Sequence, residues 1–181
     1  MQVSPATRLA EGVESSTALD VLVDRMRPVS EHLVSSPGRS KVLREGILGH
    51  ALHPVLSDVP VGAWVSAAVL DWTGGPQMQA ASRRLVGLGN LATLPTAVTG
   101  LAEYAGLDRR SQRVASLHAV VNNVALGLNT WSWFARRNEQ HGLGRTLTAA
   151  ALAAGGFGAF LGGHLAVARK IGSHEPSTIG S

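Results

Sequence analysis

The chain has 181 residues, of which 45% are hydrophobic and only 15% are charged, well below the roughly 25% typical of soluble domains. This length fits a single domain. Because the sequence contains no cysteine, disulfides, Cys-ligated zinc and Cys-ligated iron–sulfur clusters are excluded. Abundant alanine, leucine and valine, together with 21 glycines, are typical of helices that pack closely in lipid.

The N-terminal quarter is polar and contains one amphipathic segment. Leu19, Leu22, Val23 and Met26 fall on one helical face, and the pattern is expected to break near Pro28. This spacing predicts an amphipathic helix that lies at the membrane surface or on the end of a helical bundle. Residues 1–47 are therefore expected to form a cytoplasmic or interfacial segment.

Four apolar stretches follow this segment. Residues 85–102, 114–135 and 146–168 contain no Asp, Glu, Lys or Arg, and residues 54–72 contain only Asp58 and Asp71. Each stretch is close to the roughly 20 residues that a helix needs to cross a bilayer. We predict an all-α fold, an integral membrane bundle of four transmembrane helices over residues 48–170, followed by a disordered tail over 171–181. A soluble helical bundle is the alternative, but these stretches lack the polar face that a soluble surface helix needs.

Basic residues flank the stretches and indicate an orientation. With four spans, one side of the membrane receives Arg39, Lys41, Arg44, Arg109, Arg110, Arg113, Arg169 and Lys170. The other side receives Arg83, Arg84, Arg136, Arg137 and Arg145. The positive-inside rule then places both termini in the cytoplasm, and the protein in the cytoplasmic (inner) membrane. The net charge of +4, distributed in this way, favours a lipid bilayer and no nucleic acid as the partner.

Three histidines are expected at a similar depth in one leaflet. His53 opens the first span, and His118 and His164 lie about one turn inside the third and fourth spans, on the same side. Ionisable groups inside a bilayer are costly, so their convergence indicates a site. The polar residues that accompany them are His50, Asp58 and Asn122.

Two imidazoles from different helices are the axial ligands that a low-spin b-type haem requires. His118 and His164 are the preferred pair, because they lie on sequential antiparallel helices, and His53 is the alternative ligand. Small residues such as Gly162 and Gly163 would let a flat cofactor lie against the last helix. We therefore expect haem b and electron transfer, with Asp58 or Asn122 orienting the ligands.

Several alternatives remain open at this point. A divalent-metal site would bind zinc or iron through His50, His53, His118 or His164 together with Asp58. Asp58 and the histidines could also relay protons. The polar cluster could instead be structural, in a non-catalytic scaffold or an accessory subunit of a larger complex. The sequence has no Ser/His/Asp arrangement, so no catalytic residue is predicted.

Four segments, taken in order, resemble a bacterial four-helix transmembrane family of unknown function. They are "GHALHPVLSDVPVGAW…LD", "RLVGLGNLATLPTAVTGLAEY", "HAVVNNVAL" and "LGGHL", and the similarity runs from Leu48 to Lys170. The resemblance implies four spans and a family pattern that here comprises His53, Pro54, Asp58, Pro60, Gly62, His118, Asn122, Gly162, Gly163 and His164. Some members of that family are fused to a Rieske-type iron–sulfur domain. This implies electron transfer, with a Rieske-type or respiratory component as redox partner.

Overall fold

The computed structural model describes residues 4–44 and 51–169, and every regular element in these ranges is helical. The all-α prediction is confirmed. The main helices are α1 (Pro5–Ser15), α2 (Asp20–Leu33), α3 (Pro37–Arg44), α4 (Leu52–Thr73), α5 (Gln79–Tyr104), α6 (Arg109–Arg137) and α7 (His141–Gly163). Short 3-10 helices precede α2 and α5, and a π-helical turn (His164–Ala168) follows α7. His50 and the expected tail over 171–181 lie outside the described residues.

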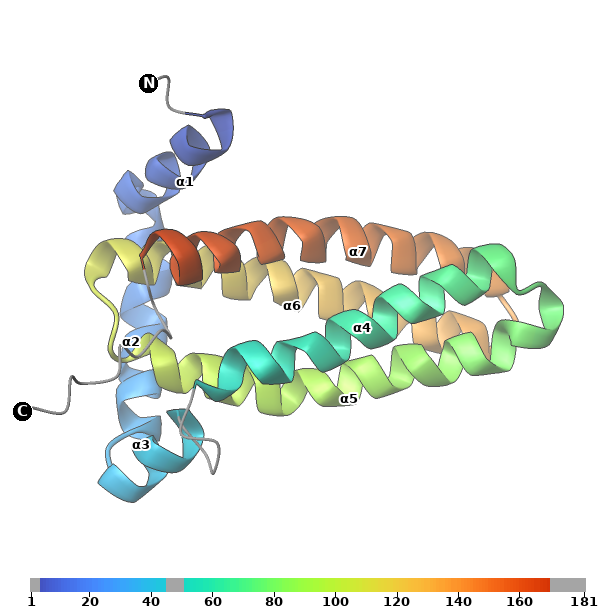
Figure 1. Cartoon of the computed structure of the whole chain (residues 1–181), viewed down its shortest axis with the longest axis horizontal. Helices are drawn as coiled ribbons and strands as arrows, with labels where there is room; N and C mark the ends of the chain where they lie inside the picture. Colours follow the sequence, from blue (N-terminus) through green and yellow to red (C-terminus); the bar gives the residue numbers. More distant parts are fainter. Residues whose placement is uncertain (1–3, 45–50, 170–181) are drawn as a thin grey trace, which may run out of the picture.

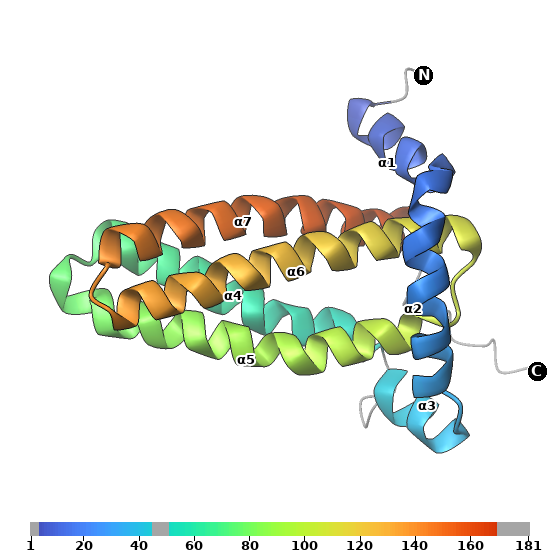
Figure 2. The same ribbon diagram turned by 180° about the vertical axis from the view of Figure 1, so that it is seen from behind.

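The four long helices α4 to α7 form an antiparallel bundle, and the three N-terminal helices lie at one of its ends (Figure 1). Helix α2 runs crosswise over that end in both views (Figure 2). The long helices are paired as two hairpins, α4 with α5 and α6 with α7. We call the end covered by α2 the near end and the opposite end the far end.

Three segments of the described chain are long and apolar enough to cross a membrane. They are Leu52–Thr73, Pro76–Tyr104 and His141–Ala168. Helix α6 has 29 residues, but it is less apolar than these segments because it carries polar residues such as Asn122, Asn123 and Asn129. The sequence predicts four membrane spans. By length and composition, three segments of the described chain qualify as spans.

The predicted break of the N-terminal helix at Pro28 is wrong, because α2 continues through this residue to Leu33. Proline inside a helix removes one hydrogen bond and costs about 3 kcal/mol. Val23 and Ser30 lie on one face of α2 and are fully buried, and α2 packs against α5 and α6. This tertiary packing offsets the local cost, and it places the amphipathic helix on the end of the bundle.

Ion pairs hold the N-terminal helices against the start of α6. The guanidinium of Arg113 donates to both carboxylate oxygens of Asp20, over 2.7 and 3.0 Å, and to the backbone carbonyl of Glu14 over 2.9 Å. Arg109 donates to Asp24 over 2.7 Å. Two-point contacts of this kind fix orientation as well as position, so they set how α2 lies across the bundle.

This attachment should depend on pH. The hydrogen bond from Arg113 holds the pKa of Asp20 below its ordinary value of 3.8. The ionised carboxylate therefore stabilises the docked state above that value, and the contribution is lost as pH falls through the lowered pKa. We expect the protection factors of the α2 amides, which correct the exchange rate for the intrinsic rate at each pH, to be steady from about pH 8 to 5 and to fall below about pH 4.

Asp20→Asn should show faster exchange in α2 at neutral pH and a weaker dependence on acid. Glu31→Gln is the matched control, since Glu31 lies on the same helix in an exposed pair with Arg27. If Asp20→Asn exchanged like the wild type at every pH, this ion pair would not hold α2 in place.

The two hairpins repeat one another in sequence and in burial. A histidine near the start, a central glycine and a charged residue near the end of the first helix recur at the same spacing. These pairs are His53 and His118, Gly62 and Gly127, and Asp71 and Arg136. On the second helices the corresponding buried positions are Ser82 and Gly144, Val86 and Thr148, Gly89 and Ala151, Thr96 and Gly158, and Thr99 and Leu161. Few paired residues are identical, so the repeat becomes visible only when burial is known.

Residues on a two-fold axis meet their own counterparts, and two pairs in this bundle do so. The rings of His53 and His118 have centroids 6.2 Å apart. Asp71 Oδ2 and Arg136 Nη2 are 2.6 Å apart. Both pairs join α4 to α6, so a pseudo-two-fold axis runs along the bundle between the hairpins. Two like charges at the second pair would repel, and the two halves carry opposite charges there.

The Asp71–Arg136 pair is buried inside the far half of the bundle. The Arg136 side chain is 0% exposed and that of Asp71 is 3% exposed. All four long helices contribute polar groups: the Ser82 hydroxyl donates to Asp71, while Arg136 donates to the hydroxyls of Ser132 and Thr148. From the sequence, Arg136 is expected to be a flanking charge beyond the third span. It lies in the core instead, because Asp71 neutralises it.

Removing one partner of this pair should destabilise the bundle strongly. Asp71→Leu or Arg136→Leu leaves a buried charge without a counter-ion, which costs about 3–5 kcal/mol. The double variant should lose less than the sum of the two single variants. Unfolding by SDS titration of the protein in mild detergent measures these differences.

The neighbouring Arg137 is exposed, so Arg137→Leu is the control and should change stability by about 0.5 kcal/mol or less. Single variants of the buried pair that unfolded at the same SDS fraction as this control would contradict a structural role for the pair.

Candidate functional site

The histidine pair lies in the near half of the bundle, toward the end that α2 covers. His53 stands in the first turn of α4, and His118 stands in α6, about two turns after that helix begins. The ring planes are inclined by 80°. Pro54 and the first turn of α4 are compatible, because an N–H at that position would have no helical partner. The expected convergence of His53 and His118 is thus present in the fold.

Each ring is held by the second helix of its own hairpin. His53 Nδ1 is 2.9 Å from the carbonyl oxygen of Thr96, and His118 Nδ1 is 2.8 Å from that of Gly158. A carbonyl oxygen only accepts, so Nδ1 is the donor in both rings, and a neutral ring then keeps a lone pair on Nε2. Thr96 and Gly158 are counterparts in the repeat, so the two rings are held in equivalent ways.

Glycines leave the space that the rings occupy. A Cβ at Gly100 would lie 2.8 Å from His53 Cε1, and a Cβ at Gly162 would lie 3.0 Å from His118 Cε1. Gly162 was a candidate from the sequence, whereas Gly100 was not. The signal that identifies Gly100 is its position four residues after Thr96, which repeats the spacing of Gly162 after Gly158. Gly163 is exposed, with open space where a Cβ would stand.

Asn122 lies against the face of the His118 ring. Its Nδ2 is 3.0 Å from Nε2 and 3.3 Å from Nδ1. A nitrogen in the ring plane could not approach both ring nitrogens so closely without colliding with Cε1 between them. The amide therefore sits over the ring, outside the in-plane direction that a hydrogen bond to a ring nitrogen requires. It supports the ring and leaves the Nε2 lone pair accessible.

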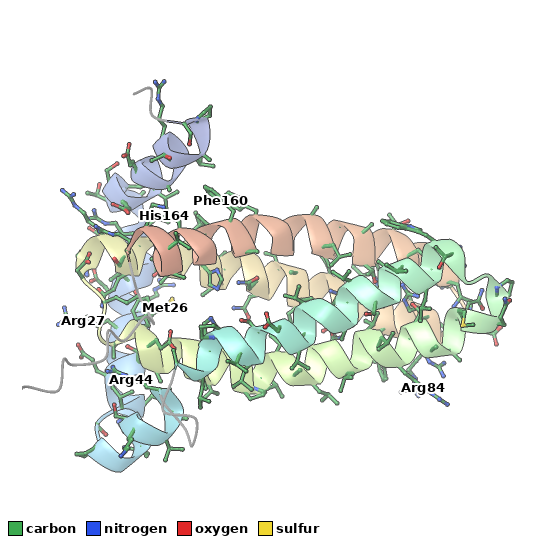
Figure 3. The ribbon with its side chains drawn as sticks, viewed as in Figure 1. Met26, Arg27, Arg44, Arg84, Phe160 and His164 are labelled. Carbon is green, nitrogen blue, oxygen red and sulfur yellow. The ribbon has the colours of Figure 1, made fainter. Side chains whose placement is uncertain are left out.

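His164 has a different partner. Its Nε2 is 2.9 Å from Glu14 Oε1, and Arg169 approaches the same carboxylate oxygen at 3.3 Å. Figure 3 shows His164 at the end of α7, beside α1. The helix predicted in the N-terminal segment contains Leu19 to Met26 and does not include α1, so this contact was not anticipated. Of the three candidate histidines, the fold joins two and attaches the third to the N-terminal segment.

One further polar candidate, Asp58, can be located in the described residues. Asp58 is exposed on α4, and His50 lies outside the described residues. Within the described ranges, no group of three or more His, Cys, Asp or Glu side chains is placed to hold a metal ion. Zinc sites use three or four protein ligands. The described residues offer two imidazoles and therefore give the zinc or iron alternative no support.

Long apolar helices with buried polar groups along their common axis define an integral membrane protein of the helical-bundle class. The family described as "Predicted membrane protein (DUF2231)" matches residues 49–175, and the chain belongs to it. The function of this family is unknown, and the matched range contains the four segments on which the resemblance rests. Comparison with curated proteins and with solved structures found no match.

The glycines that flank the rings should tolerate no side chain. Gly100→Ala or Gly162→Ala should displace a ring, weaken the Nδ1 hydrogen bond and cost about 1–3 kcal/mol through overpacking. Histidine side-chain ¹⁵N NMR reads the tautomer, and SDS unfolding reads the stability.

Gly127→Ala is the matched control, because open space surrounds that position in α6. This substitution should be neutral or should stabilise the helix by up to about 1 kcal/mol. Equal effects of Gly100→Ala and Gly127→Ala would show that the contact with His53 is not a constraint.

Proposed function

We propose that the protein is an inner-membrane electron carrier with four transmembrane helices, which binds haem b between His53 and His118. The observation that carries this proposal is the pair of imidazoles on the bundle axis. The two rings come from different hairpins, and each is fixed through Nδ1 with Nε2 left as a potential ligand.

The path of the chain supports the fourth span. Helix α5 ends at the near end of the bundle and α7 begins at the far end (Figure 1). If α4, α5 and α7 cross the membrane, the segment that connects α5 to α7 must cross it as well. Helix α6 is that segment, and several of its polar side chains, among them Asn129, Ser132 and Arg136, are buried against the other helices and away from lipid.

The spacing of the two ring centroids would let both rings hold one bound group. The observed separation is 6.2 Å. Haem iron needs only two axial protein ligands, so a pair of histidines suffices where a zinc site would lack donors.

The hairpins also differ in separation along the bundle. At the far end they are joined by the Asp71–Arg136 pair, and α4 lies closer to α7 there than at the near end (Figure 1). At the near end the rings of His53 and His118 lie between α4 and α6. Gly100 and Gly162 lie against the two rings in this half, and Gly158 lies against Asn122. Small residues let a flat apolar group lie close to the helices, which suits a macrocycle placed between the hairpins.

Each residue then has a defined role in this proposal. His53 and His118 would hold the haem iron, in place of the pair His118 and His164 that the sequence favoured, because His164 is bound to Glu14. The carbonyls of Thr96 and Gly158 orient the rings and raise their basicity. Asn122 supports the His118 ring. When bound, haem iron supplies one-electron transfer.

The partner and the orientation are parts of the same proposal. An electron carrier needs a donor and an acceptor, and the family resemblance suggests a Rieske-type or respiratory component for one of them. The near end carries Arg39, Lys41, Arg44, Arg109, Arg110, Arg113 and Arg169 among the described residues. At the far end Arg136 is buried inside the bundle and not in a loop, so it does not count among the flanking charges there, which strengthens the bias toward a cytoplasmic near end.

Absorption spectra of the protein purified in detergent, oxidised and then reduced with dithionite, test the haem proposal. The expected result is a Soret band and a reduced α band of a b-type haem. Both should be lost in His53→Ala and in His118→Ala, and both should be retained in His164→Ala.

The His164→Ala variant controls for loss of a histidine at the same depth, and an SDS unfolding curve shows whether each variant is folded. A folded wild-type protein that stayed colourless after expression with added haem would overturn the proposal. A folded, colourless protein would favour the structural alternative, in which the two rings serve to bond neighbouring helices in a membrane scaffold.

A further inference from the structure

A second polar site lies at the far end, on the groove between α5 and α6. It is an open pocket lined by Arg83, Arg84, Trp133 and Arg137. The Trp133 indole lies against Gly87 of α5, where a Cβ would be only 2.8 Å from Nε1. The guanidinium carbon of Arg137 is 5.0 Å from the centre of the Trp133 ring. The indole is thus fixed between the two helices and carries one arginine over its face.

The charges of this pocket are not balanced within the described chain. In the described ranges, Arg83, Arg84 and Arg137 form no ion pair, although Arg136, one residue away, is paired with Asp71. Arg109 and Arg113 at the near end are paired with acidic residues as well. Figure 3 shows Arg84 near the far end of α5, with its side chain pointing away from the bundle. Three guanidiniums around one pocket repel one another unless an anion lies between them.

The position of the pocket along the bundle indicates which class of anion it would meet. Arg83 and Arg84 directly precede the uncharged stretch of α5. At the same end of the bundle, Trp72 and Trp131 are 72% and 59% exposed. Exposed tryptophans of a membrane helix mark the level of the lipid headgroups. The pocket therefore lies where the phosphates of the bilayer are found.

We propose that Arg83, Arg84 and Arg137 bind a phosphate group at the far membrane surface, with Trp133 as the wall of the site. The planar guanidinium fork matches phosphate oxygens with two parallel hydrogen bonds, which is the contact that favours arginine in such sites. The phosphate belongs to the headgroup of an anionic phospholipid or is free in solution. This site is separate from the histidine pair, so it holds whether or not the protein binds haem.

Calorimetric titration of the full-length protein in non-ionic detergent tests this site. Short-chain phosphatidylglycerol is one titrant, short-chain phosphatidylcholine is the neutral comparison, and inorganic phosphate is the soluble one. A lipid site predicts saturable binding of phosphatidylglycerol that is stronger than that of phosphatidylcholine. A free-phosphate site predicts saturable binding of inorganic phosphate and its competition with phosphatidylglycerol.

Arg83→Gln/Arg84→Gln/Arg137→Gln should weaken binding of the preferred anion at least about tenfold, because it removes the charge-assisted hydrogen bonds to the phosphate. Arg110→Gln is the control, because Arg110 is exposed at the opposite end of α6. Both variants should unfold at the wild-type SDS fraction. Equal affinity of the triple variant and this control, or no saturable binding of either anion, would overturn the proposal.

Discussion

The arrangement of the bundle depends on the buried ion pair between Asp71 and Arg136. Burying a single charge in a low-dielectric core costs more free energy than a fold of this size can offset. The pair is stable because each charge neutralises the other and hydroxyl groups of the neighbouring helices complete its hydrogen bonds. Since Asp71 lies on α4 and Arg136 on α6, the pair fixes the two hairpins in register. That register places His53 and His118 at the same level in the other half of the bundle.

The pseudo-two-fold axis explains why polar groups gather along the centre. Side chains near such an axis face their counterparts, so each hairpin supplies half of every central contact. At the near level the counterparts are both histidines, whose rings are held by equivalent carbonyl groups. At the far level the counterparts carry opposite charges and form an ion pair that joins α4 to α6. Repeats related by an axis along the membrane normal are a known way to build membrane bundles.

Local patterns predicted several features correctly. The apolar stretches indicated helices, and the alternation of their direction placed His53 and His118 at a common depth. Other features could not be read from the sequence. His164 binds Glu14 of α1, and the pairing of two residues 150 positions apart follows from no local pattern. Arg136 follows an apolar stretch and therefore resembles a charge at the membrane surface, but it is buried in an ion pair with Asp71. Gly100 becomes significant only when Thr96 is known to hold His53.

The amino-acid sequence by itself determined that the chain is helical, that it enters a membrane and which helix ends lie together. These properties follow from composition and periodicity, which depend only on residues that are close together in the sequence. Only the tertiary structure decided which polar groups meet: His53 with His118, Asp71 with Arg136, and His164 with Glu14. Those pairings depend on the rotation of each helix about its own axis. Packing of small residues and the buried charges set that rotation, and both act between segments far apart in the chain.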